Sequence, residues 1–114
     1  MNIYSYKQFC RKIVMTVHAE TISYCARRLK ALSDPTRWAI VAALADGPRL
    51  LADLQTELQI EQTLLSHHLK VLRDEELVVS MREGRLLRCR LADDVTLPAG
   101  RRGIDLGCCR LELN

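Results

Sequence analysis

The sequence predicts a mainly α-helical fold with one small β-hairpin, and three observations carry this prediction. Between residues 19 and 75, apolar residues recur at helical spacing, interrupted by Asp34-Pro35 and by Gly47. Residues 77–92 instead form two β-rich runs around Glu83-Gly84. With 114 residues, 48% of them hydrophobic and 27% charged, the chain has the size and composition of one globular domain.

The first helix is expected over about residues 19–32. Its apolar stripe is made of residues three and four positions apart, namely Ile22, Cys25 or Ala26, Leu29 and Leu32. This register turns Cys25 towards the core. It places three basic residues elsewhere on the helix, Arg27, Arg28 and Lys30.

The next three helices follow in close succession. One begins at an N-cap, Ser33 or Asp34, has Pro35 in its first turn and stops at Gly47. A short helix is then indicated by leucines at helical spacing, Leu51, Leu54 and Leu58. Another helix covers about residues 62–75. Because the connection between these last two is short, the pair is typical of a helix-turn-helix.

The helix over residues 62–75 has two different faces. One face is apolar and consists of Leu65, Leu69 and Leu72. The opposite face is polar and consists, at i, i+3, i+4 and i+7, of Thr63, Ser66, His67 and Lys70. Neighbours on a helix point about 100° apart, so His67 and His68 are poor partners in a metal site. We expect His67 to face outwards and His68 to pack or cap.

The two β-rich runs after this helix predict a hairpin joined at Glu83-Gly84. Strand alternation turns Cys89 towards the core and Arg88 and Arg90 to the other side. Beyond Asp93 the chain contains one proline and three glycines before its vicinal cysteines, which predicts an irregular segment with at most a final short strand. The expected organisation is an N-terminal arm or extra helix over 1–18, a domain over 19–92 and an irregular C-terminal segment over 93–114.

Helices, a helix-turn-helix and an arginine-bearing hairpin together describe a winged helix, which binds double-stranded DNA. In this interpretation Gln62, Thr63, Ser66 and His67 face base edges, whereas Lys70 and the wing residues Arg82 and Arg85 contact phosphates. A solvated helix face is the alternative, because similar helix pairs with hairpins also occur in protein-interaction domains. The net charge of +3 is too small to decide between them.

Three segments carry a resemblance to a known family: LKALSDPTRWAIVAAL, LLSHHLKVLRDEELV and REGRLLRCRL. They resemble the ArsR/SmtB family of bacterial winged-helix repressors over about residues 26–91. The resemblance implies a homodimer on an inverted-repeat operator, released by a metal ion, a metalloid or a reactive thiol species. By position, Arg37 and the segment SHHLKVLR correspond to the family's motifs.

The sequence departs from that family at both of its usual effector sites. The helix before the recognition helix, RLLADLQTEL, contains no cysteine, and the C-terminal segment contains proline and glycine but no histidine. A metalloid site in that helix and a zinc site on a final helix are therefore not expected. Without a regular final helix, dimerisation would depend on the long N-terminal segment.

The vicinal pair Cys108-Cys109 is then the candidate effector site, with Cys10 as a candidate third donor. Arsenite or antimonite is the expected effector, because trivalent arsenic and antimony prefer soft thiolates. The alternative is a thiol-redox sensor in which Cys108 forms a disulfide or a persulfide. Buried packing of the two thiols is the structural alternative.

Other classes of function are not expected. The chain has no C-x-x-C at a helix start and no phosphate-binding loop, so we do not expect an enzyme, and DNA binding itself requires no cofactor. Five cysteines, an odd number, argue against a disulfide framework. The N-terminus lacks the apolar middle of a signal peptide, so we expect a cytoplasmic chain without membrane contact.

Overall fold

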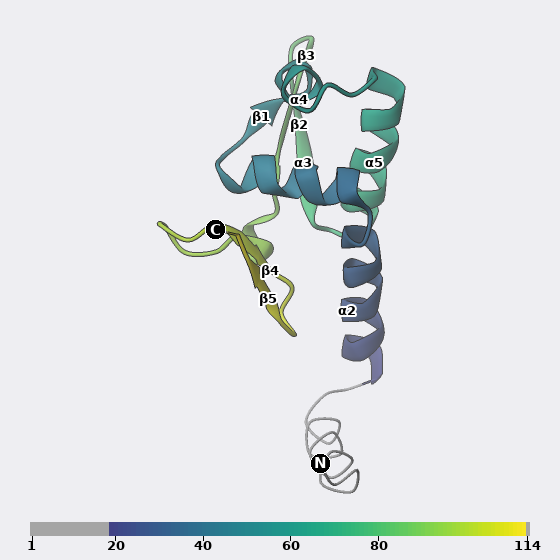
Figure 1. Ribbon diagram of the computed structural model, residues 1–114, viewed down its shortest axis with the longest axis vertical. Coiled ribbons are helices and arrows are strands. Elements are labelled where there is room, and N and C mark those ends of the chain that lie inside the picture. Colours follow the sequence, from purple (N-terminus) through teal and green to yellow (C-terminus); the bar gives the residue numbers. More distant parts are fainter. Residues whose placement is uncertain (1–18, 114) are drawn as a thin grey trace, which may run out of the picture.

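The computed structural model describes residues 19–113, and this range forms four α-helices and two small antiparallel sheets (Figure 1). The helices are α2 (Ala19–Leu32), α3 (Pro35–Ala45), α4 (Leu51–Leu58) and α5 (Gln62–Asp74). The strands are β1 (Arg49–Leu50), β2 (Val78–Glu83), β3 (Leu86–Leu91), β4 (Gly103–Asp105) and β5 (Arg110–Glu112), with a short 3-10 helix, η1 (Asp93–Val95), after β3. None of the helices in 19–113 has the length and hydropathy needed to cross a membrane.

The N-terminal caps of α3 and α5 differ, because the sequence predicted the first and not the second. The Asp34 carboxylate accepts a hydrogen bond from the Arg37 backbone N–H at 3.0 Å, as predicted for the start of α3. Glu61 caps α5 in the same way, accepting from the backbone N–H groups of Thr63 at 2.8 Å and Leu64 at 3.1 Å. Glutamate is outside the usual N-cap set, so this cap was not anticipated. With Gln59 in the left-handed conformation, it fixes the tight turn between α4 and α5.

The hairpin β2–β3 forms where the sequence predicts it. Six residue pairs connect the strands, from Val78 opposite Leu91 to Glu83 opposite Leu86, and Gly84-Arg85 form the two-residue turn. Gly84 has a φ of 63°, at the position where type II′ turns place glycine. The strand β1, which the sequence analysis did not predict, adds to the other edge of β3. A strand of two residues is too short to show the alternation of apolar and polar residues by which strands are predicted.

The core lies between the helices and the inner face of the sheet. Its fully buried side chains come from α3, α4, α5, β3 and the segments around them, and include Ile40, Val41, Leu54, Leu65, Leu72 and Cys89. The strand-parity prediction for Cys89 is thus confirmed, since this thiol is 0% exposed. The leucine face predicted for α5 is the face that packs on the core.

The helix α2 packs only part of the predicted apolar stripe on the core, because Cys25 and Leu32 are buried but the other members of the stripe are not. Arg28 is 2% exposed, whereas Ile22 is 45% and Leu29 is 42% exposed. Cys25 is buried, as expected. Placing Arg28 away from the core was therefore wrong. Helical periodicity identifies apolar stripes, but it cannot identify a buried cation whose donors are satisfied by distant backbone carbonyls.

The C-terminal segment is more regular than its prolines and glycines suggest. Strands β4 and β5 pair antiparallel over three residue pairs, and this second hairpin is anchored by the buried side chains of Ile104 and Leu106. In Figure 1 the hairpin β4–β5 lies below α3, whereas α4 and the tip of β2–β3 lie above α3. The expectation of an irregular segment with at most one short strand is corrected, because cross-strand pairing is a non-local property that breaker residues do not exclude.

Candidate functional site

The polar face of α5 is exposed along its whole predicted length. The side chains assigned to it from the sequence are all open to solvent in the structure: Gln62, Thr63, Ser66, His67 and Lys70. The side chains on the other face, including Leu65 and Leu72, are buried. The two faces of the helix are therefore separated as predicted, and five polar side chains stand together on one surface.

His68 fixes the position of this face. It is 7% exposed, and its Nδ1 lies 3.2 Å from Nη1 of Arg37 and 4.0 Å from Oδ2 of Asp34. Burial lowers the pKa of His68, although the Asp34 carboxylate opposes this. A neutral imidazole can accept from the Arg37 guanidinium, so we assign Nδ1 as acceptor. This contact holds α5 against the start of α3.

Lys70 already has a partner on its own helix. Its amino group lies 2.9 Å from Oδ2 of Asp74, four residues along α5, and both side chains are largely exposed. Exposed pairs of this kind contribute little to stability because water and salt screen them. The ammonium group can therefore exchange the carboxylate for another anion at the surface.

A groove of about 300 Å³ lies between α4, the first residue of α5 and the wing, as we call the hairpin β2–β3. It is lined by residues of α4, α5 and the wing, among them Gln55, Gln62, Arg82, Arg85 and Leu86. Gln55 was missed by the sequence analysis, because only its place beside Gln62 in space indicates a role. Within residues 19–113 neither Arg82 nor Arg85 has an ion pair, whereas Arg88 pairs with Glu83 at 3.1 Å.

The cysteines are arranged differently from the predicted vicinal site. Cys25 on α2 and Cys108 in the turn between β4 and β5 form a disulfide, with their Cα atoms 6.4 Å apart. Cys109 is an exposed free thiol, and Cys89 is free and buried. Cys10 lies outside the described residues. Cys25 had been set aside as a core residue, yet its buried side chain is the one that meets Cys108.

The turn that carries these thiols is held by its own backbone. The backbone N–H of Leu106 donates to the Cys109 carbonyl at 2.8 Å, and that of Gly107 donates to Asp105 Oδ1 at 2.8 Å. Gly107 has a φ of 90°, which allows the chain to reverse there. Among residues 19–113, no group of three or more His, Cys, Asp and Glu side chains is arranged to hold a metal ion.

Comparison with known proteins agrees with this geometry. Residues 34–80 match the family described as bacterial regulatory protein, arsR family. The HTH-type transcriptional regulator CmtR of Mycobacterium tuberculosis is 44% identical over 71 residues, 62% of this chain and 60% of its own. The arsenical resistance operon repressor of Staphylococcus xylosus is 45% identical over 56 residues, 49% of this chain and 54% of its own. This chain thus spans less than two thirds of both relatives.

A solved structure extends the comparison to three dimensions. The homodimeric winged helix-turn-helix DNA-binding domain of Mb0332 from Mycobacterium bovis is 32% identical, with a TM-score of 0.62, and the match covers 65% of this chain and 68% of that one. The predicted winged helix-turn-helix fold is confirmed. The matched segment 34–80, the relatives and this solved structure show that the chain belongs to the arsR family of bacterial regulatory proteins.

Proposed function

We propose that this protein is a homodimeric transcriptional repressor that binds a double-stranded DNA operator and is released by chemistry at its cysteines. The observation that carries the proposal is the exposed polar face of α5 beside a wing whose tip presents Arg82 and Arg85. A recognition helix of this kind fits the major groove, and wing cations fit the adjacent backbone. The relatives named above are regulators, which supports a role in transcription rather than catalysis.

Each polar side chain then has a defined role. Gln62 suits adenine, with which its amide can form two hydrogen bonds, while Thr63, Ser66 and His67 reach neighbouring base edges. Lys70 leaves Asp74 for a phosphate, and Arg82 and Arg85 contact phosphates from the wing. The base contacts select the sequence, and the phosphate contacts set the affinity for DNA in general.

The dimer is supported by the outer face of α2. Ile22 and Leu29 are large apolar side chains exposed seven residues apart on that helix. They lie two turns apart on one side, so a second copy can cover both. The Mb0332 domain is itself homodimeric. Two α5 helices related by a two-fold axis would read an inverted repeat.

The DNA part of the proposal is tested with alanine variants of α5. Gln62→Ala or Ser66→Ala should weaken binding to the selected operator by about 1–3 kcal/mol and relax the preferred sequence. Thr21→Ala, an exposed change on α2, is the control and should leave both unchanged. Unaltered sequence preference in the Gln62, Thr63, Ser66 and His67 variants would remove α5 as the reading helix.

Arsenite or antimonite is one candidate effector. After reduction, Cys25 and Cys108 lie close enough to share an ion, and the exposed Cys109 is the next thiol along the chain. Three soft thiolates suit trivalent arsenic. The relative from Staphylococcus xylosus is an arsenical resistance operon repressor, which supports this effector class. Cys10 remains a further candidate donor.

A second candidate is a thiol-redox repressor, and the contact between Cys25 and Cys108 favours it specifically. Two thiols lose two protons and two electrons to form the disulfide; with hydrogen peroxide as oxidant, the products are the disulfide and two water molecules. This reaction needs only the two sulfurs that the structure brings together. It therefore requires less rearrangement than a three-thiolate site.

Operator-binding assays of serine variants distinguish the two effectors. Redox control predicts release by peroxide that requires Cys25 and Cys108 but not Cys109. Arsenite control predicts release of the reduced protein that requires Cys25, Cys108 and also Cys109, so the requirement for Cys109 distinguishes the two effectors. In both cases the variants should bind the operator normally without effector, because the thiols lie outside α5 and the wing. Normal release of the Cys108→Ser/Cys109→Ser double variant by both reagents would exclude this site.

A further inference from the structure

Arg28 is buried in a place where its charge is poorly compensated. Its side chain is 3% exposed, while that of its neighbour Arg27 is 60% exposed. The acidic partner of Arg28 is Asp94, 3.8 Å away and itself 72% exposed. Desolvation of a guanidinium group is costly, and one distant, hydrated carboxylate does not offset it. Hydrogen bonds to other groups must therefore hold Arg28 in the interior.

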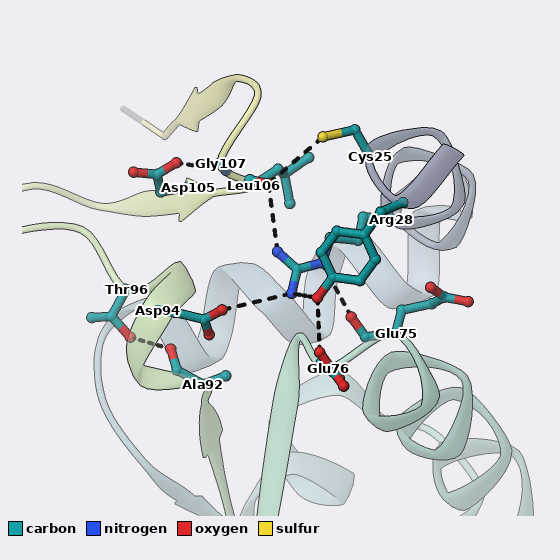
Figure 2. Close-up of polar contacts among 11 residues, drawn as sticks. Cys25, Arg28, Glu75, Glu76, Ala92, Asp94, Thr96, Asp105, Leu106 and Gly107 are labelled. Atoms are coloured by element: carbon teal, nitrogen blue, oxygen red, sulfur yellow. Dashed lines mark hydrogen bonds and ion pairs between the residues drawn. The ribbon is translucent and has the colours of Figure 1, made fainter. Parts of the chain in front are cut away.

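Those hydrogen bonds join two separate parts of the protein (Figure 2). Nε of Arg28 donates to the Glu75 carbonyl at 3.2 Å, and Nη1 donates to the Leu106 carbonyl at 3.5 Å. Glu75 is the C-cap of α5, and Leu106 directly precedes the turn that contains Cys108. One side chain thus contacts the end of the recognition helix and the beginning of the thiol-bearing turn.

Tyr24 strengthens the connection on the α5 side. Nη2 of Arg28 donates to the Tyr24 hydroxyl oxygen, and the Tyr24 hydroxyl donates to Oε2 of Glu76 at 2.8 Å. The Arg28 guanidinium carbon also lies 4.1 Å from the centre of the Tyr24 ring. Residues 75 and 76, where α5 ends and the chain turns into the wing, are therefore held from α2.

The Leu106 carbonyl is a point where the two oxidation states differ. Sγ of Cys25 lies 3.9 Å from this oxygen, within reach of a weak hydrogen bond from a thiol. A disulfide sulfur has no hydrogen to donate. Oxidation therefore leaves the Arg28 guanidinium as the side-chain donor to Leu106 and ties the turn covalently to α2. A reduced Cys25 thiol can share this acceptor with Arg28 and a disulfide cannot, so the hydrogen bonding at Leu106 depends on the oxidation state, which is the requirement for coupling.

We infer that Arg28 is a positioning residue that couples the oxidation state of Cys25 and Cys108 to the orientation of α5 and the wing. This inference rests on the redox candidate of the proposed function. When the disulfide forms, the turn shifts, and its hydrogen bond from Arg28 to the Leu106 carbonyl moves the guanidinium. The hydrogen bond from Arg28 to the Glu75 carbonyl then moves the end of α5. The wing follows, because its first residues continue directly from that end.

The experiment compares operator affinity of reduced and oxidised full-length protein in Arg28→Lys and Arg27→Lys. Lysine keeps the charge but presents a single ammonium group that cannot span Glu75 and Leu106 as the guanidinium does. A coupled system typically shows a ratio of about 5- to 150-fold between its states. We expect this ratio in the wild type and in Arg27→Lys, and its loss in Arg28→Lys, while mass spectrometry still shows disulfide formation.

Hydrogen exchange adds a readout that a merely structural role would not move. In the wild type, oxidation should change amide protection at residues 71–77, and in Arg28→Lys it should not. If Arg28→Lys fails to fold, Tyr24→Phe serves instead, since it removes the hydroxyl that joins Arg28 to Glu76, and it should reduce the ratio. If the folded variant keeps the wild-type ratio of operator affinities between the reduced and oxidised states, the role of Arg28 is overturned, while redox control itself is not. An identical affinity of both oxidation states in the wild type would overturn redox control itself.

Discussion

The protein has two antiparallel hairpins that are held in different ways. The wing has six cross-strand pairs, a third strand on its edge, and an inner face packed on the core through Val78, Cys89 and Leu91. The C-terminal hairpin has three pairs and stands as a separate two-stranded sheet. Its contacts with the rest of the molecule include Ile104 and Leu106 in the core and the disulfide from Cys108.

This difference is consistent with the proposed roles of the wing in DNA contact and of the C-terminal hairpin in control. An isolated two-stranded hairpin is marginal in water, so its position depends on its anchors. The wing belongs to the core sheet, so its fold and the charge at its tip do not depend on the disulfide. The C-terminal hairpin is anchored by Ile104 and Leu106, by the ion pair of Arg102 with Asp46, and by a disulfide bond that a reductant breaks. Thiol chemistry can therefore change its attachment while the proposed DNA-reading surface stays folded.

The largest expected effect tests that dependence directly. Reduction of the Cys25–Cys108 disulfide, which links residues 83 apart, should lower the free energy of unfolding by about 2–4 kcal/mol. Urea denaturation with and without reductant measures this change. Hydrogen exchange should show lost protection in β4 and β5 but not in the wing. Cys109→Ser is the matched control, and an equal effect of reductant on Cys25→Ser would contradict the assignment.

Two glycine substitutions then separate the hairpins. A Cβ at Gly103, where φ is 145°, would meet the Leu111 carbonyl oxygen and lie 2.9 Å from the Glu112 Cα, so Gly103→Ala should cost about 1–3 kcal/mol or more. A Cβ at Gly84 would have no atom within 4 Å, so Gly84→Ala should lower the free energy of unfolding only by the strain of a positive φ, about 1 kcal/mol. Thermal unfolding of both variants provides the comparison. Equal destabilisation of the two variants would mean that the close approach of β5 to Gly103 does not determine the effect of Gly103→Ala.

Charge at the two hairpins should also have separate effects on DNA. Arg82→Ala and Arg85→Ala should each weaken binding to all sequences alike and reduce the slope of log affinity against log salt by about one unit. Arg101→Ala is the control near β4, because this residue is ion-paired with Glu112 away from the wing. Affinity measured over a series of salt concentrations gives the slopes. A similar loss in all three variants would indicate a general charge effect.

The smallest expected effect is the dependence of stability on pH through His68, at the contact between α3 and α5. The pKa of His68 is lowered in the folded protein, chiefly by burial, so the unfolded chain binds a proton more readily. The contribution of His68 to the free energy of unfolding should therefore be fully present above the pKa of His in the unfolded chain, about 6.5, and should decrease as the pH falls below it. Urea midpoints measured across this range should show the loss. In His68→Asn, whose amide oxygen can replace Nδ1 as acceptor, that slope should disappear.

Much of the DNA-reading unit was predictable because its signals are local. Asp34, one of the two predicted candidates, caps α3; the leucine and polar faces of α5 are separated as their spacing indicated, and Cys89 is buried according to strand parity. The exposure of the candidate DNA contacts followed from the same periodicity. Their contact with DNA remains a prediction. Glu61 and Gln55 were missed, because the first is an unusual cap and the second depends on the neighbouring wing.

The sequence by itself therefore determined where the helices and the wing lie and which sides of α5 and β3 are buried, since caps, turns and periodicity act over a few residues. Only the tertiary structure decided that Arg28 rather than Leu29 faces the interior, and that Cys25 meets Cys108 rather than remaining a packed thiol. Both outcomes depend on partners 47 to 83 residues away. A guanidinium becomes a buried residue only when such distant carbonyls satisfy its donors, and no local pattern records them.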